Sequence, residues 1–122
     1  MAEKDDLGKK GEEIACIYLA NKGFQIKERN WRYKNGEIDI VAFDKKELVI
    51  VEVKTRSAVI YEEPRDSISD KKIRFLVNGA EEYILQTDFN GETRFDIISI
   101  KWFGEGKYEI EHIPEAFYPP VG

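Results

Sequence analysis

Two apolar runs that are interrupted by charged residues constrain the fold of this chain most. Residues 36–41 read GEIDIV and residues 48–56 read LVIVEVKTR. Strands buried on both faces are normally continuous in Val, Ile and Leu, and an isolated charge there is costly unless it is paired or bound to a metal. The pattern therefore predicts a sheet interior in which something holds Asp39, Glu52 and Lys54. A divalent metal ion next to a phosphodiester is the best candidate.

Length and composition indicate an ordinary globular protein. With 122 residues, 42% hydrophobic and 35% charged, the chain can form one domain with one core. We expect a single domain over residues 1–122, with an irregular tail from about residue 114. No apolar run approaches the roughly 18 residues that span a bilayer, and the charged amino terminus does not resemble a secretory signal. We therefore expect a cytoplasmic protein without a membrane partner.

The single cysteine and single histidine limit the chemistry of any metal site. Cys16 can form no intramolecular disulfide and fits a reducing cytosol. With only Cys16 and His112 available, a zinc site of the Cys/His type is excluded. Any metal ion must therefore be held by oxygen ligands.

Hydrophobic periodicity predicts a helix, three strands, a second helix and two further strands. Asp5 and Asp6 can cap a first helix that runs to about Lys22 and stops at Gly23, and Ser69 can cap the second. The predicted helices end near residues 22 and 86; the second begins at residue 70, and the strands cover residues 24–31, 37–43, 47–55, 93–103 and 107–113. Residues 56–68, with Pro64, are expected to form a loop. The order indicates an α/β protein with a sheet of about five strands.

The turn between the second and third predicted strands decides whether the carboxylates converge. A two-residue turn at 45–46, or a four-residue loop at 44–47, pairs residues whose numbers sum to 91 and puts Asp39 opposite Glu52 on one face. A three-residue turn at 44–46 would turn the two carboxylates to opposite faces. The turn residues carry no Asn-Gly or Gly-Gly signature, so both registers remain open.

On one face, these side chains form a coherent metal site. Two carboxylates about one strand spacing apart repel each other unless a cation lies between them. Mg²⁺ prefers oxygen ligands and is typically held by one or two carboxylates plus substrate phosphate. Such an ion can lower the pKa of a bound water and polarise a phosphoryl oxygen. Lys54 lies on the same face as Glu52 and can orient the water or stabilise charge on phosphorus. The alternative, a surface Glu/Lys pair, is disfavoured by the apolar residues on both sides of Glu52.

Charge is segregated along the chain, although the net charge of −5 argues mildly against nucleic-acid binding. Residues 21–35 carry five cations against one acid, and a second basic group opens the later helix. A basic rim around an acidic centre suits a polyanion that must be held while a metal acts on it. Each basic cluster can equally be a solvated face. The candidate nucleic-acid contacts are Arg29, Arg32, Lys34, Arg56 and Lys72.

The order of these residues carries a family resemblance. A helix glutamate, a strand aspartate and a Glu-x-Lys triplet resemble the PD-(D/E)xK nuclease superfamily, which includes archaeal Holliday junction resolvases. More closely, an ordered set of motifs resembles the uncharacterised bacterial YraN-type family, and the likeness covers about residues 7–117. These motifs are Gly8-x-x-Gly11-Glu12-x-x-Ala15, Arg29-Asn30-Trp31-Arg32, Gly36-Glu37-Ile38-Asp39, Val51-Glu52-Val53-Lys54-Thr55-Arg56, Arg94-Phe95-Asp96 and Ala116-Phe117.

The resemblance implies a restriction-endonuclease-like α/β fold, with a mixed central sheet flanked by helices. It also implies a catalytic set consisting of Glu12, Asp39, Glu52 and Lys54. In such nucleases the aspartate and the second glutamate bind Mg²⁺ or Mn²⁺ with the main-chain carbonyl after that glutamate, here Val53, and the helix glutamate often completes the site.

The chain departs from the superfamily signature at one position and offers two candidate glutamates at another. Ile38 stands where the superfamily signature has proline, which is tolerable because the proline is not a ligand. Glu13 adjoins Glu12, but Gly8, Gly11 and Glu12 lie near one helical face, which favours Glu12 pointing inward. Glu12 can also be interpreted as a first-turn acid that the helix dipole favours.

The implied function is a metal-dependent endonuclease that hydrolyses DNA phosphodiester bonds, on branched or repair intermediates. Resolvase-like relatives act as dimers, so a homodimer is expected by the same resemblance. Two alternatives remain open. One is a non-catalytic nucleic-acid-binding or protein-interaction domain on a nuclease fold. The other is a hydrolase that uses paired carboxylates on a sugar, which gives Lys54 no evident role.

Overall fold

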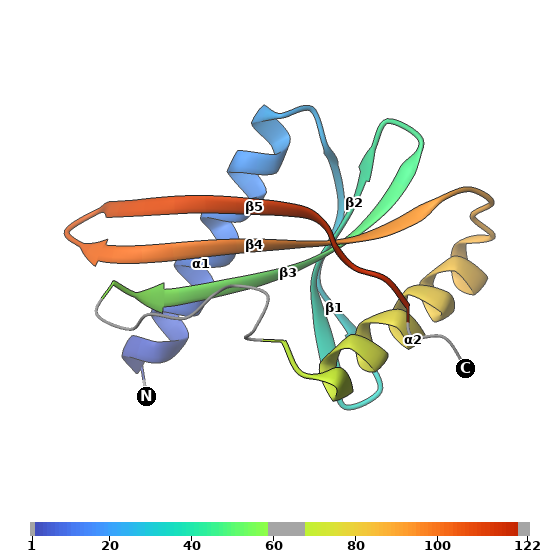
Figure 1. Cartoon of the computed structure of the whole chain (residues 1–122), viewed down its shortest axis with the longest axis horizontal. Coiled ribbons are helices and arrows are strands. Elements are labelled where there is room, and N and C mark those ends of the chain that lie inside the picture. Colours follow the sequence, from blue (N-terminus) through green and yellow to red (C-terminus); the bar gives the residue numbers. More distant parts are fainter. Residues whose placement is uncertain (1, 59–67, 120–122) are drawn as a thin grey trace.

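The predicted order of helices and strands is confirmed by the computed structural model, which describes residues 2–58 and 68–119, with side chains from Asp6 onward. The elements are α1 (Ala2–Asn21), β1 (Gln25–Tyr33), β2 (Gly36–Asp44), β3 (Glu47–Ser57), α2 (Asp70–Thr87), β4 (Thr93–Gly104) and β5 (Lys107–Phe117) (Figure 1). The prediction of a loop over residues 56–68 is wrong for Arg56 and Ser57, which belong to β3, and residues 59–67 lie outside the described residues. In the part of the chain that is described, no helix is both long enough and apolar enough to cross a membrane.

The five strands form one mixed sheet in the order β1-β2-β3-β4-β5. Neighbouring strands are antiparallel except β3 and β4, which run parallel, with α2 between them in the chain. A parallel pair needs such a crossover connection, whereas the antiparallel pairs are joined by short turns. The sheet is strongly twisted, so that the β1–β2 hairpin crosses the direction of the β4–β5 hairpin steeply (Figure 1). This α/β architecture is consistent with a restriction-endonuclease-like fold.

The two helices bury opposite faces of the sheet. Leu19 of α1 belongs to a core cluster with Val51 of β3, and Leu76 of α2 belongs to a second cluster with Ile50. Because successive side chains of a strand point to opposite faces, β3 supplies both clusters alternately. This double burial explains why residues 48–51 are continuously apolar, and why a charge that follows them in the same strand is conspicuous.

Helix α1 begins earlier than predicted and ends as predicted. Its first residue is Ala2, so the prediction that Asp5 or Asp6 caps its start is wrong. Gly23 has a φ of +96°, and the N–H of Phe24 donates to the carbonyl oxygen of Leu19 over 3.0 Å. Glycine adopts this left-handed conformation readily, which makes it the usual residue just after a helix. For α2, the Ser69 cap is confirmed.

The prediction of an irregular tail from about residue 114 is wrong as far as Phe117. Strand β5 continues through Pro114 to Phe117, and Phe117 pairs with Phe95 of β4. Proline is tolerated because β5 is an edge strand, where a missing N–H costs no ladder bond on the open side. The register shifts between Phe95 and Ile97, and Glu115 has a φ of +49°. This irregularity, which the sequence does not reveal, lets the strand continue.

Candidate active site

The β2–β3 hairpin has the register in which paired residue numbers sum to 91. Asp44 pairs with Glu47 across a two-residue turn at 45–46, and Ile40 pairs with Val51. The antiparallel pairs end there, one step before Asp39 and Glu52 would meet. The two strands therefore part where the chain carries its buried acids.

The backbone of β2 changes direction at Asp39. Ile38 packs in the α2-side cluster and Ile40 in the α1-side cluster, although residues two apart in a regular strand share a face. The pairing with β1 also passes over this position, from Arg29–Ile40 to Trp31–Ile38. Asp39 therefore has no paired residue in β1 or β3 in the strand register.

The Asp39 carboxylate contacts β3 directly. Its Oδ2 accepts the backbone N–H of Val53 over 2.8 Å, so a carboxylate replaces the carbonyl that a regular strand would supply. Burial raises the pKa of Asp39 to about 7; repulsion by Glu52 and Glu12 adds to this, while the Val53 N–H and Lys72 oppose it. A carboxyl group that holds a proton near neutral pH is typical of a functional site.

Glu52 is buried between two ammonium groups. The residue is 4% exposed. Its Oε2 lies 3.6 Å from Lys54 Nζ, and its Oε1 lies 3.8 Å from Lys72 Nζ. Burial raises the pKa of Glu52, whereas Lys72 and Lys54 lower it and Glu12 raises it further. Within the described residues Oε1 has no hydrogen-bond partner, which is costly for a buried carboxylate oxygen.

Glu12 approaches this pair from α1. Its Oε1 accepts a hydrogen bond from Asn30 Nδ2 over 3.0 Å, and its charge raises the pKa of Asp39. The neighbouring Glu13 is exposed and pairs with Arg29, with 3.1 Å between Glu13 Oε1 and Arg29 Nη2. The structure thus directs Glu12 toward the buried acids and Glu13 toward the surface.

Gly11 lets α1 come this close to β3. A Cβ atom at position 11 would collide with the side chain of Thr55. The helix can therefore lie against the strand only because the residue before Glu12 is glycine.

The five candidate nucleic-acid contacts are not gathered in one place. Lys34 and Lys72 line one pocket between the β1–β2 turn and the start of α2. Arg29 is paired with an acid of α1, as described, and Arg32 Nη1 lies 3.2 Å from a carboxylate oxygen of Glu37 in β2. Arg56 lies near the end of β3, three residues beyond Val53, and is half-buried. Lys72 touches the acidic pair directly, with its Nζ 3.8 Å from Glu52 Oε1.

The site suits a divalent cation because its potential ligands are carboxylate oxygens. Glu52 Oε1 is a buried carboxylate oxygen without a hydrogen bond, and Asp39 and Glu12 add negative charge beside it. Such hard oxygen donors suit Mg²⁺ or Mn²⁺. As the side chains lie, no group of three or more His, Cys, Asp or Glu residues in the described segments has ligand geometry. Lys72 and Lys54 balance the negative charge instead.

The sequence prediction missed one residue of this site, Asn30, and one contact, that of Lys72 with Glu52. Asn30 has a φ of +50° in the middle of β1, which turns its amide toward Glu12. Asparagine is depleted in strands and is among the few residues that adopt positive φ, so its place in a strand was the available signal. Lys72 was predicted as a phosphate contact, but its approach to Glu52 depends on where α2 docks, which no local pattern reveals.

The fold and these contacts define a class of protein. It is an α/β protein with a restriction-endonuclease-like arrangement of strands, in which an acidic pair and a lysine lie where the second and third strands part. The family described as "Uncharacterised protein family UPF0102" matches residues 11–100. The chain belongs to this family, which is the YraN-type family that the sequence motifs indicated.

Relatives resemble the chain over almost its whole length. A UPF0102 protein of Bacteroides fragilis is 47% identical over 122 residues, covering 99% of both chains. A second, from Flavobacterium psychrophilum, is 45% identical over 119 residues, covering 97% of this chain and 98% of the relative. A third, from Phocaeicola vulgatus, is 44% identical over 122 residues, covering 99% of both.

Proposed function

We propose that this protein is a metal-dependent endonuclease that hydrolyses DNA phosphodiester bonds. The observation that carries the proposal is the environment of Glu52. A buried carboxylate, one oxygen of which accepts no hydrogen bond from the described residues, lies beside Asp39 and between two lysines, at the point where β2 and β3 part. A structural ion pair has no need of an unsatisfied oxygen or of a second carboxylate that repels the first.

The residues take separate roles in this proposal. Asp39 and Glu52, with the main-chain carbonyl of Val53, would hold Mg²⁺ or Mn²⁺, and Glu12 would complete the site. When bound, the ion would lower the pKa of a water molecule and polarise the phosphoryl oxygen. Lys54, whose ammonium is held 3.6 Å from Glu52, orients the attacking water and offsets charge on phosphorus.

Surrounding residues support the same proposal. Asn30 donates to Glu12 and fixes its direction. Lys34 and Lys72 face a common pocket that a phosphate-bearing strand can enter. The further parts of the proposal are a cytoplasmic location, branched or repair intermediates as substrates, and a homodimer that cuts two equivalent strands.

Cleavage of a panel of DNA structures tests the proposal. Branched, flapped, single-stranded and linear DNAs would be incubated with Mn²⁺ and the native protein, and with Asp39→Ala, Glu52→Ala and Lys54→Ala. Each substitution is expected to reduce cleavage roughly 100-fold or more, the loss typical of removing a group that stabilises charge in the transition state. Cleavage that survives Glu52→Ala and Lys54→Ala would indicate a contaminant and overturn the proposal.

The two adjacent glutamates of α1 provide a matched control. Glu12→Gln removes the acid that lies near the buried pair, whereas Glu13→Gln removes an exposed acid one residue away. Only Glu12→Gln is expected to impair cleavage. Equal effects of the two substitutions would remove Glu12 from the site. Binding of DNA by native protein without any cleavage would favour the non-catalytic alternative.

A further inference from the structure

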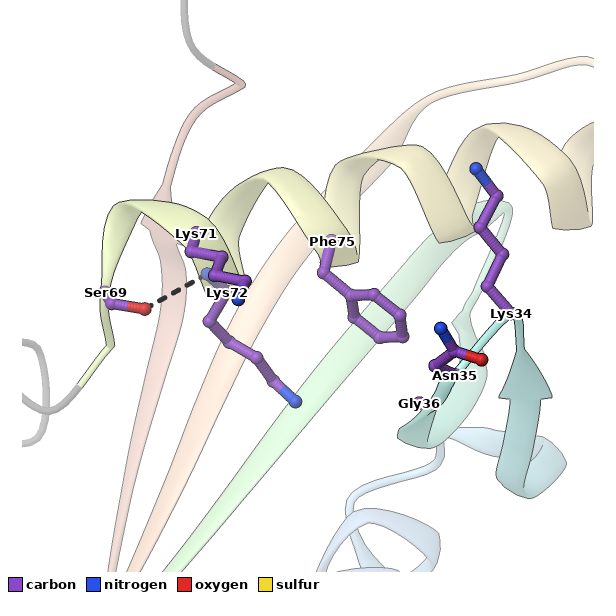
Figure 2. A pocket seen from close by; sticks show the side chains of 7 residues that line it. All are labelled: Lys34, Asn35, Gly36, Ser69, Lys71, Lys72 and Phe75. Atoms are coloured by element: carbon purple, nitrogen blue, oxygen red, sulfur yellow. Dashed lines mark hydrogen bonds between the residues drawn. The ribbon is translucent and has the colours of Figure 1, made fainter.

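A pocket of about 560 Å³ opens between two elements of the fold, and one of its lining residues, Lys72, also contacts Glu52. The β1–β2 turn at residues 34–36 forms one wall and the first turns of α2, from Ser69 to Phe75, form the other. Figure 2 shows Phe75 reaching from α2 toward the turn, with Lys72 on one side of the ring and Lys34 and Asn35 on the other. This volume falls in the range of roughly 300–1,000 Å³ that is typical of small-ligand sites.

The lining combines cations with an aromatic face. Lys34, Lys71 and Lys72 contribute three ammonium groups from two different elements, and no acid is among the described residues that line the pocket. The Nζ of Lys72 lies 5.2 Å from the centroid of the Phe75 ring. Ammonium groups beside an aromatic ring match a nucleotide, because lysine binds phosphate and every base can stack on a ring.

The position of the Phe75 ring depends on Gly36. A Cβ atom at position 36 would lie 2.8 Å from the ring carbon Cζ of Phe75, closer than side chains normally approach. The ring therefore lies over the turn only because that residue is glycine. Tyr33 supports the ring from β1, with 5.5 Å between the two ring centroids. The aromatic face is held in place rather than left to adjust.

Lys72 joins this pocket to the acidic pair. Its ammonium lies over Phe75 and also 3.8 Å from Glu52 Oε1. The Ser69 hydroxyl already accepts the backbone N–H of Lys72 over 3.1 Å, so the start of α2 does not offer that N–H to a phosphate. The lysine side chains can contact an anion, and those of Lys34 and Lys71 are exposed.

We propose that this pocket binds one unpaired nucleotide of the DNA strand, next to the phosphodiester at the acidic pair, with its base on Phe75 and its phosphates against Lys34 and Lys71. This inference rests on the proposed endonuclease function and narrows its substrates. A base inside a duplex is stacked on both sides and can lie on a protein ring only after it has been unpaired and unstacked. The substrate must therefore be unpaired at this position, as in a flap, a gap, a branch point or a single strand.

Binding without metal tests the pocket separately from catalysis. The anisotropy of a short fluorescein-labelled oligothymidylate would be titrated in EDTA with native protein, Phe75→Ala and Lys71→Ala. We expect about a 10-fold loss of affinity for Phe75→Ala. For Lys71→Ala, the slope of log K against log salt should become shallower by about 0.7. Lys107→Ala, an exposed lysine in β5 outside the pocket, is the matched control and should change neither.

Abasic scanning then locates the nucleotide. A flapped DNA with one abasic residue moved stepwise past the cut would be tested with Mn²⁺. One position is expected to lose about 10-fold in cleavage, and Phe75→Ala should abolish that dependence on position. Phe75→Leu keeps an apolar side chain in the core and so controls for a loss of cleavage caused by misfolding. This variant should also remove the dependence of cleavage on the abasic position.

The outcomes separate the two proposals. A cleavage rate that is the same at every abasic position and in Phe75→Ala would overturn the proposed nucleotide pocket. It would not contradict the proposed endonuclease function. Binding that depends on Phe75 and Lys71 without cleavage of any DNA would support the pocket and overturn the endonuclease. Tighter binding of the matching oligouridylate than of oligothymidylate would overturn the assignment to DNA.

Discussion

Asp39 carries a cost to stability that the Asp39→Asn variant should reveal. The pKa of Asp39 is raised from 3.8 to about 7, mainly by burial and then by Glu52, so above pH 7 the folded protein holds a charge that its surroundings disfavour. Asparagine keeps an oxygen that can accept the Val53 N–H and removes the repulsion. We expect Asp39→Asn to be about 1 kcal/mol more stable at pH 8 and to lose affinity for Mn²⁺. Urea unfolding and calorimetric titration measure these two effects.

A substitution at the other end of β2 is the control. Asp44 lies 3.1 Å from Arg94 Nη1, so Asp44→Asn removes an attractive partner and should not stabilise the protein. Because the folded-state pKa of Asp39 is raised, the difference between native and Asp39→Asn should shrink as pH falls from 8 toward 4. An Asp39→Asn variant that is less stable than native at pH 8 would contradict this account.

Asp96 illustrates the opposite case, a buried carboxylate that is fully satisfied. His112 Nε2 lies 2.8 Å from Oδ2, while Arg94 Nε and the N–H of Glu115 donate to Oδ1 over 3.0 and 3.1 Å. Burial alone would raise the pKa of Asp96, but these hydrogen bonds hold it below 3.8. A lowered pKa contributes stability above pH 3.8, which is lost as pH falls through the folded-state value.

The Asp96→Asn variant should therefore be strongly destabilised at neutral pH. Breaking this buried charged network takes one partner from Arg94 and one from His112, and the expected loss is about 3 kcal/mol at pH 7. Urea unfolding between pH 3 and pH 7 measures it, and the gap between native and variant should narrow toward the acid end. Parallel stability curves over that whole range would show that Asp96 does not carry the charge assigned to it.

At the scale of elements, the contact between α1 and β3 can be tested through glycine. Gly11→Ala would push α1 off β3 because its Cβ collides with Thr55, and we expect a loss of about 2 kcal/mol together with weaker Mn²⁺ binding through displaced Glu12. Gly8→Ala is the matched control, since nothing lies within 4 Å of a Cβ there. It should be neutral or stabilising because alanine favours helix. Thermal unfolding and calorimetry compare the two, and equal effects would refute the contact.

The elements themselves could be predicted because their signals are local. Alternation and helical periodicity placed β2, β3 and α2 within two residues of their observed ends, and Ser69 and Gly23 marked helix boundaries. The sum-91 register was one of two open choices, since the turn chemistry did not decide it. Pro114 misled the prediction of β5 because strand position in the sheet, not local sequence, decides whether proline is tolerated.

The detailed site could not be predicted because it depends on packing between distant segments. The parting of β2 and β3 at Asp39, the positive φ of Asn30 and the approach of Lys72 to Glu52 all arise where three elements meet. The pattern of residue types along the strands identified the acids and Lys54. The second ammonium group, that of Lys72, reaches Glu52 only because of where α2 packs. The position of the Phe75 ring in α2 likewise depends on a distant segment, because it requires glycine at position 36 in the β1–β2 hairpin.

For the whole molecule, the proposed ion would add a connection between elements that already pack together in the core. Glu12 comes from α1, Lys72 from α2 and the acidic pair from β2 and β3, which no longer pair with each other there. A ligand that binds only the folded state stabilises it by about 2.7 kcal/mol at one hundred times its dissociation constant. We therefore expect Mn²⁺ to raise the midpoint of thermal unfolding. The rise should be larger at pH 8 than at pH 6, because Asp39 must lose the proton that its pKa of about 7 retains.

The net charge of −5 makes a control essential, because an acidic protein attracts divalent cations over its surface. Glu52→Gln removes the buried acid, whereas Glu13→Gln removes an exposed acid and lowers the net negative charge equally. Mn²⁺ should stabilise Glu13→Gln as it does native protein and should leave Glu52→Gln almost unchanged. Equal stabilisation of both variants would mean that the cation is held by the general field of the molecule, and the parting of β2 and β3 would then be a structural feature without a metal.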